Sequence, residues 1–226
     1  GNTVPSFDAL RRHLMTPGKA TAVHSVIQHL NLLPPVQGYV FDNYGADGAY
    51  KRQYFTADNA GRIDAIRETI AEWHAAGLVD EAEFYYLLAL LIDAADHVAN
   101  MSGTYGAFLK IWRSVALKRI QLAGRQVYSN SQHNQAFNLD AHSLVVRIKG
   151  DVLYLDPPYN ARQYAPNFHV LESLAVWDKQ QLAGKTGLRK YDHQKSAFSS
   201  RNGAAGALEQ IVSNADFRYI VLSYNN

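Results

Sequence analysis

The sequence predicts an α/β protein in which a mostly parallel sheet carries one inserted, all-helical lobe. Two patterns lead to this prediction. Between residues 57 and 122, apolar side chains recur every three or four positions, which is typical of amphipathic helices. After about residue 134 the pattern changes to short apolar runs with turn residues, separated by segments long enough for crossover helices. Such alternation favours parallel βαβ units.

The helical lobe is expected to contain three helices. The first presents an apolar face over residues 63–73 and is expected to end at Gly77. The second begins at Asp80, which can form a capping box with Glu83 three residues later, and it continues through a leucine-rich stretch. The third is predicted to cover residues 105–122.

Three apolar runs are expected to form strands, at residues 136–139, 152–155 and 219–222. The run at 152–155 contains no polar residue, as expected of a central strand that is covered on both faces. Open α/β sheets bind ligands outside the carboxyl ends of their strands. The residues that follow Leu155 are therefore a candidate site.

Charge is segregated along the chain, although its 22 basic and 20 acidic residues nearly balance. Residues 42–96 contain eleven acidic and four basic side chains, whereas residues 97–139 contain five basic side chains and no acidic one. A second basic stretch, residues 185–201, has five basic residues opposed only by Asp192. Two basic segments of this kind predict a polyanionic partner, and a solvated helix face is the alternative explanation.

Composition excludes several classes of protein. The chain has no cysteine, which excludes disulfide frameworks, thiolate zinc sites and iron–sulfur clusters and fits a reducing, cytoplasmic setting. No apolar run reaches the roughly 18 residues of a membrane-spanning helix, so no membrane partner is expected. The nine histidines lack the spacing of metal-ligand pairs, and no metal site is expected.

A short motif, Asp156-Pro157-Pro158-Tyr159, follows the 152–155 run. The two prolines remove two N–H donors and keep the loop extended, which leaves backbone carbonyl groups without partners. A carboxylate, a free carbonyl and an aromatic ring can together accept both hydrogens of a planar amine and stack on its ring. A plain turn with a capping carboxylate is the alternative.

This motif resembles the catalytic motif of S-adenosylmethionine-dependent amino methyltransferases. The longer match resembles the Dam-like adenine-specific DNA methyltransferases, particularly those partnered with type II restriction enzymes. The resemblance implies a Rossmann-like methyltransferase sheet, S-adenosylmethionine as cofactor and double-stranded DNA as substrate. The motif alone leaves cytosine-amine and RNA methylation open, whereas the wider matches favour adenine in DNA. They lie at residues 54–55, 95–100, 104–110, 154–164, 168–173 and 222–225.

The resemblance implies a role for each residue of the motif, and all four are expected to be catalytic. Asp156 accepts a hydrogen bond from the adenine amine, and the carbonyl of Pro157 helps to hold this amine. Pro158 stiffens the loop, and Tyr159 stacks on the flipped base. Asp140 corresponds to the family position that contacts the adenine of the cofactor. Together with Asp156 and Pro157, it makes up the expected cofactor-binding set.

The resemblance also predicts how the chain is divided. Residues 1–41 are expected to lead into the methyltransferase domain, residues 42–125 to form the target-recognition lobe, and residues 126–226 to form the catalytic α/β portion. DNA contacts are expected from the third helix and from the residues after the motif. These are Tyr105, Lys110, Arg113, Lys118, Arg119, Arg162, Tyr164 and His169, the last of which could equally serve capping or packing.

One part of the family pattern is missing from the chain. The Phe-x-Gly-x-Gly cofactor loop is absent, and none of the glycine pairs has the strand–loop–helix setting that such a loop needs. The sheet is therefore expected to be incomplete, with its N-terminal strands contributed by a missing N-terminal half or by a partner chain. The alternative to an active enzyme is a non-catalytic DNA-binding or subunit-pairing fragment of one.

The basic segment yields a quantitative prediction for DNA binding. If about five cations each neutralise one phosphate, the logarithm of the association constant should fall with the logarithm of salt concentration at a slope of about −4 to −5. Fluorescence anisotropy of a labelled duplex over a series of salt concentrations measures this slope. An affinity that does not change with salt would contradict the prediction.

Overall fold

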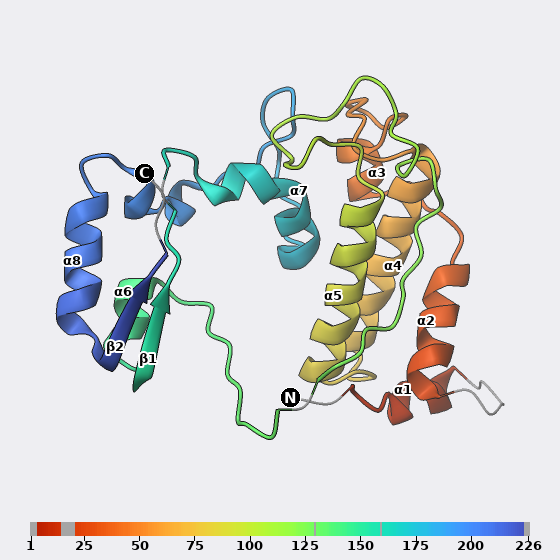
Figure 1. The fold of residues 1–226 in the computed structure, drawn as a ribbon. Coiled ribbons are helices and arrows are strands. Elements are labelled where there is room, and N and C mark those ends of the chain that lie inside the picture. Colours follow the sequence, from red (N-terminus) through yellow and green to blue (C-terminus); the bar gives the residue numbers. More distant parts are fainter. Residues whose placement is uncertain (1–3, 15–20, 129, 159, 224–226) are drawn as a thin grey trace. The chain divides into compact units, whose positions relative to one another are not determined.

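The computed structural model describes residues 4–14, 21–128, 130–158 and 160–223 (Figure 1). These residues form two compact units, of which the first comprises Gly1–His133 and Asn167–Lys190 and the second Asn134–Pro166 and Tyr191–Asn226. The functional division at residues 41/42 and 125/126 stays a prediction. No helix among the described residues is long and apolar enough to cross a membrane.

The first unit is helical. Its core is made mainly by side chains of α2, α4 and α5 together with buried aromatic residues from the loops between them. The unit contains α1 (Asp8–His13), α2 (Ala22–Leu32), α3 (Tyr39–Tyr44), α4 (Ala57–Ala75), α5 (Glu81–His97) and most of α7 (Tyr164–Val176).

The first two predicted helices of the lobe are confirmed as α4 and α5. Gly77 follows α4 with a φ of +68°, and its N–H donates to the carbonyl of His74 over 3.0 Å. A left-handed glycine is a common way to end a helix. At the start of α5, the Asp80 side chain accepts from the Glu83 N–H over 2.8 Å and the Glu83 side chain accepts from the Asp80 N–H over 3.0 Å, so the predicted capping box is present.

The predicted third helix, over residues 105–122, is wrong. Residues 99–122 have no helix, and the segment crosses the lobe as an irregular chain (Figure 1). A helix satisfies its own backbone groups, so an irregular segment needs other partners for the groups that it buries. Three asparagine side chains from the helical lobe provide them, and the 99–122 segment is fixed in place without helical turns.

Asn100, which is completely buried, holds the first half of the segment. Its side-chain amide donates to the carbonyls of Leu109, over 2.9 Å, and Gln53, over 3.2 Å. Its side-chain oxygen accepts from the N–H of Arg113 over 3.0 Å. One buried side chain thus satisfies three backbone groups from three places in the sequence.

Asn59 of α4 and Asn31 of α2 hold the second half. The Asn59 amide donates to the carbonyl of Lys118 over 2.8 Å, and its side-chain oxygen accepts from the N–H of Ile120 over 2.8 Å. Asn31 pairs in the same way with both backbone groups of Leu122, over 2.9 and 2.8 Å. Each asparagine therefore substitutes for a neighbouring backbone.

The second unit contains a two-stranded parallel sheet. Strand β1 (Lys149–Leu155) pairs with β2 (Asp216–Leu222), with Lys149 opposite Asp216 and Leu155 opposite Leu222. The strands predicted at 152–155 and 219–222, and their parallel order, are confirmed. The other elements are α6 (Ala141–Val145), the 3₁₀ turns η1 (Asp192–Gln194) and η2 (Ala197–Ser199), and α8 (Ala204–Asn214).

Two predictions about this sheet are wrong for the described chain. Residues 136–139 form no strand, and Phe137 and Leu139 are about half exposed, at 49% and 48%. Strand β1 is not covered on both faces, since Val152 is 56% and Tyr154 62% exposed. The physical reason is a lack of covering elements, because Val145, Ala207 and Ile211 are the only apolar side chains that are buried among the described residues of the second unit.

The burial of Asn100 yields a prediction about stability. Asn100→Ala leaves three backbone groups without partners, at about 1–3 kcal/mol for each group that stays buried, so we expect a loss of roughly 2–4 kcal/mol in the free energy of unfolding. Urea denaturation followed by tryptophan fluorescence measures it. Gln28→Ala removes an exposed amide from α2 and should change stability by less than about 0.5 kcal/mol. Equal, small effects of both variants would contradict the role of Asn100.

Candidate functional site

The Asp-Pro-Pro motif lies at the carboxyl end of β1. Strand β1 ends at Leu155, whose carbonyl accepts from the N–H of Ser223 over 2.9 Å. Asp156 is exposed, Pro157 and Pro158 are half-buried, and the three residues have no regular secondary structure, as predicted for an extended loop. The predicted stacking residue, Tyr159, lies outside the described residues.

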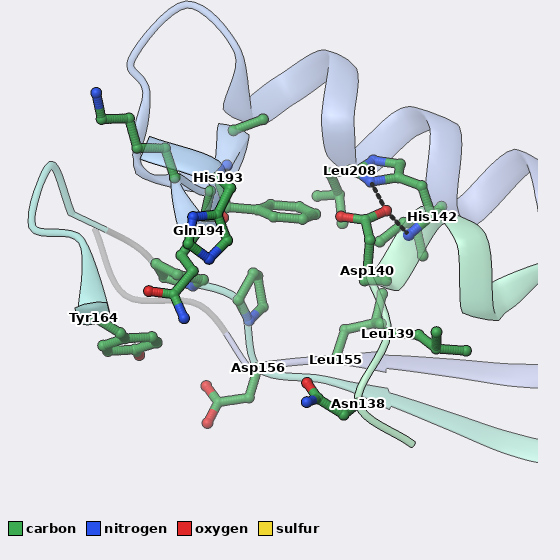
Figure 2. A pocket seen from close by; sticks show the side chains of 18 of the residues that line it. Asn138, Leu139, Asp140, His142, Leu155, Asp156, Tyr164, His193, Gln194 and Leu208 are labelled. Carbon is green, nitrogen blue, oxygen red and sulfur yellow. Dashed lines mark hydrogen bonds and ion pairs between the residues drawn. The ribbon is translucent and has the colours of Figure 1, made fainter. Parts of the chain in front are cut away.

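A cavity of about 710 Å³ opens beside this loop within the second unit (Figure 2). Its volume is in the range of cofactor sites, and its wall combines apolar side chains with a few polar groups, as such sites do. Five segments contribute to it: the stretch leading into α6, the end of β1 with the motif, Tyr164 at the start of α7, residues 193–198 with their 3₁₀ turns, and α8. The lining residues that matter below are Leu139, Asp140, Asp156, Pro157, Tyr164 and Phe198.

Asp140 has a defined local position because it caps α6. Its carboxylate accepts from the N–H groups of His142, over 3.0 Å, and Ser143, over 3.3 Å. Nε2 of His142 lies 3.0 Å from the carbonyl of Ala207, which connects the capped turn to α8. The cap holds one edge of the carboxylate, and Figure 2 shows this residue at the cavity wall. The structure therefore brings Asp140 and Asp156 to one cavity.

A second connection holds the loop after the motif, and sequence reasoning missed it. The side chain of Gln163 donates to the carbonyl of Ser196 over 3.2 Å and accepts from its N–H over 2.8 Å. The hydroxyl of Ser199 donates to the carbonyl of Arg162 over 3.2 Å. Residues 193–198 thereby become a wall of the cavity. A glutamine followed by a distant serine has no recognisable spacing, so no sequence signal could have revealed this pair.

Most residues predicted to contact DNA are exposed, in two places. In the first unit, Lys110, Arg113, Lys118 and Arg119 are exposed along the 99–122 segment. Arg113 also donates from one guanidinium nitrogen to the carbonyl of Met101, and Arg119 donates in the same way to the carbonyl of Asn31. In the second unit, Arg162 is exposed beside the motif, and Tyr164 is exposed at the cavity.

Tyr105 and His169 lie elsewhere, in the core of the first unit, where they are 0% and 1% exposed. Nε2 of His169 lies 2.9 Å from the Tyr105 carbonyl, and the Tyr105 hydroxyl donates to Asp96 over 2.8 Å. Burial lowers the pKa of His169 to about 4, so the ring is neutral at physiological pH. Side chains buried in this way cannot reach DNA without unfolding part of the lobe, and the DNA contacts proposed below omit both.

Comparison with known proteins identifies the family of the chain. The family model for D12 class N6 adenine-specific DNA methyltransferases matches residues 22–226, which include parts of both units. The chain belongs to this family. No solved structure matches it significantly.

The curated relatives of this methyltransferase chain include modification enzymes. It is 43% identical over 201 residues to the type II methyltransferase M.NlaIII of Neisseria lactamica, an alignment that covers 89% of the chain and 60% of the relative. It is 43% identical over 225 residues to M.FokI of Planomicrobium okeanokoites, covering 100% of the chain and 34% of the relative. Modification methylase StsI of Streptococcus sanguinis is 37% identical over 225 residues, which make up 33% of its length. The chain thus spans between about a third and three fifths of these relatives.

The buried His169 yields a prediction about pH. Its pKa is lowered from 6.5 in the unfolded chain to about 4 in the folded one, so the stability it contributes is complete above pH 6.5 and is lost as pH falls toward 4. The loss over this window should be about 3 kcal/mol. Urea denaturation at several pH values, on the wild type and on His169→Gln, isolates the contribution. The variant should show a shallower decline below pH 6.5, and parallel curves would contradict a neutral, buried histidine.

Proposed function

We propose that this methyltransferase chain transfers a methyl group from S-adenosylmethionine to the exocyclic amine of a flipped adenine at a specific DNA site, as the modification enzyme of a restriction-modification system. Membership of the adenine-specific family supports the reaction, and the names of the relatives support the biological setting. The observation that carries the proposal is the cavity at the end of β1, where the motif and Asp140 lie together.

The residues of this cavity fit S-adenosylmethionine. Leu139 and Phe198 offer apolar surface for an adenine ring, and the carboxylates of Asp140 and Asp156 offer acceptors for its polar groups. The wall carries two carboxylates and one lysine, Lys195, and this excess of negative charge is compatible with a sulfonium cation. When bound, S-adenosylmethionine supplies an electrophilic methyl group.

Asp156 and Pro157 would hold the amine that receives this methyl group. The nitrogen of adenine's amine is a weak nucleophile because its lone pair is delocalised into the ring. A carboxylate and a carbonyl that accept its two hydrogens favour a geometry in which the lone pair faces the electrophile. Because the attack is a direct displacement, this positioning accounts for much of the acceleration, and no metal ion is required.

The adenine must leave the duplex to reach Asp156, which costs a few kcal/mol of stacking and pairing. Stacking on an aromatic ring offsets part of this cost. Tyr159 is proposed for that role from the family motif. Tyr164 adds a second aromatic side chain, which is 56% exposed and lines the same cavity. Arg162, exposed between the two, is proposed to bind a phosphate near the flipped nucleotide.

Residues 42–125 are proposed to be the target-recognition lobe. The four exposed cations of the 99–122 segment, Lys110, Arg113, Lys118 and Arg119, would bind DNA phosphates. The backbone that carries them is held by three asparagine side chains, so little backbone entropy is lost when they bind.

The sheet supports a proposal about assembly. Val152, Tyr154 and Tyr219 are all more than half exposed on β1 and β2, whereas the strands of a parallel sheet are normally covered on both faces. We propose a Rossmann-like methyltransferase sheet in which further strands, from the same polypeptide or from a partner chain, complete this pair. The same exposure favours the second candidate function, a DNA-binding or subunit-pairing module that transfers no methyl group by itself.

Substitution of the motif aspartate tests the reaction. Asp156→Ala should reduce methyl transfer by at least about a hundredfold, because it removes an acceptor of the amine, while DNA affinity stays within about twofold. The measurement is transfer of labelled methyl from S-adenosylmethionine to duplex DNA. Asp151→Ala, which removes an exposed carboxylate from β1, is the matched control and should keep wild-type activity. Full activity in Asp156→Ala would refute the role of this residue.

Two further readouts separate the alternatives. Digestion of the labelled DNA shows which base carries the methyl group, and label on cytosine or on RNA would replace the adenine assignment. Calorimetry with S-adenosylmethionine tests whether the chain is instead a non-catalytic DNA-binding or subunit-pairing module. Retained DNA binding with no heat and no label would favour the non-catalytic function.

A further inference from the structure

Arg52 is a buried cation whose hydrogen-bond acceptors are all backbone carbonyls, and its guanidinium also lies over the ring of Tyr50, 4.4 Å from the ring centroid. The residue is 4% exposed. Its guanidinium donates to the carbonyls of Asn43 over 3.0 Å, Gly184 over 2.9 Å and Lys185 over 3.1 Å. No carboxylate of the described residues forms an ion pair with it. Its positive charge is therefore stabilised by carbonyl dipoles and an aromatic face but not neutralised by a carboxylate, and it contributes to the electrostatic potential of the surface above it.

Two of these carbonyls belong to a tight hairpin at residues 183–188. Ala183 and Leu188 pair through both backbone groups, over 2.9 and 2.8 Å. Gly184 and Gly187 have φ values of +68° and +72°, which residues other than glycine rarely adopt. A Cβ on Gly187 would also lie 2.9 Å from Nη1 of Arg52, so the glycine admits the guanidinium. The hairpin and Arg52 therefore fit each other closely.

The base of the hairpin is fixed as well. The hydroxyl of Tyr44, which is completely buried, donates to the carbonyl of Gly187 over 3.2 Å. Arg189 forms two parallel bonds with Asp178, over 2.9 and 2.8 Å, and so neutralises that carboxylate. What remains at the tip is Lys185, exposed and with no ion pair among the described residues.

The residue after Arg52 holds the other basic segment. The amide of Gln53 donates to the carbonyl of Lys110 over 3.3 Å. Arg52 and Gln53 are consecutive, so the backbones of Lys110 and Lys185 each lie within the reach of one side chain from a single dipeptide. Both lysine side chains are exposed. Two stretches 75 residues apart in the sequence are thus joined at one place in the first unit.

We propose that the 183–188 hairpin is a DNA-contact element, in which Lys185 binds a phosphate near the one bound by Lys110 and Arg52 is the positioning residue that presents it. This inference rests on the proposed function, because duplex DNA is the polyanion concerned. A lysine on a backbone that is already ordered loses less entropy on binding than one on a free loop. The buried charge of Arg52 adds to the attraction without contacting the DNA.

Neutralising the tip tests the contact. Lys185→Ala should weaken duplex binding by roughly three- to tenfold and make the salt slope less steep by about 0.9, the contribution of one phosphate. Lys179→Ala is the matched control, because this lysine belongs to the same unit but is paired with Glu68. It should leave the slope unchanged. A wild-type slope in Lys185→Ala, on a wild-type chain that binds DNA and transfers methyl groups, would overturn this inference alone, whereas a wild type that does neither would overturn the proposed function with it.

A conservative change tests the positioning role. Arg52→Lys keeps the charge, but its single ammonium nitrogen cannot occupy the three separate positions from which Nε, Nη1 and Nη2 of Arg52 donate, so it should weaken DNA binding about as much as Lys185→Ala does. The double variant should be no weaker than Lys185→Ala alone, since both act through one contact. Thermal unfolding shows whether Arg52→Lys is folded, and if it is not, Lys185→Ala still decides the contact. Additive losses in folded variants would show that Arg52 does not act through Lys185.

Discussion

The basic surface of this protein depends on amide side chains that substitute for a backbone. Asn31, Asn59 and Asn100 supply the donors and acceptors that a helix over residues 99–122 would have found within itself. A helix would distribute its cations around its circumference, so that only part of them could face one partner. An irregular chain that is fixed at several points by hydrogen bonds can direct each cation toward solvent. In return, each of these asparagine side chains must have its hydrogen bonds complete, because a polar group without partners in the protein interior is destabilising.

The same kind of hydrogen bond fixes one loop in each unit. Gln163 pairs with the backbone of Ser196 at the cavity, and the guanidinium of Arg52 binds three carbonyls at the hairpin. In each case a long polar side chain reaches a segment far away in the sequence. Regular elements make the scaffold of this chain, while hydrogen bonds from side chain to backbone determine where these two loops lie within their units.

Local sequence signals predicted what depends on local physics. The capping box at Asp80, the glycine stop at Gly77 and the two parallel strands follow from neighbours a few residues apart, and all three are correct. The position of Asp156 after a strand was predictable for the same reason. The helical periodicity over 105–122 led to a wrong prediction, because the buried side chains of Asn59 in α4 and of Asn100, which precedes this stretch, bind its backbone groups. The burial of His169 also depends on residues far away in the sequence. Neither the irregular course of the 99–122 segment nor this burial could therefore be derived from residue spacing.

Because the faces of β1 and β2 are exposed, the structure of the Asp156 loop depends on what surrounds the two strands. A two-stranded sheet is at best marginally stable in water, and the motif begins where one of its strands ends. A partner chain that covers these strands would stabilise the folded unit by mass action, in proportion to the logarithm of its concentration. The geometry around Asp156 is then coupled to assembly. Methylation capacity would rise with the supply of the covering surface, and a chain left alone would present a strand edge open to aggregation.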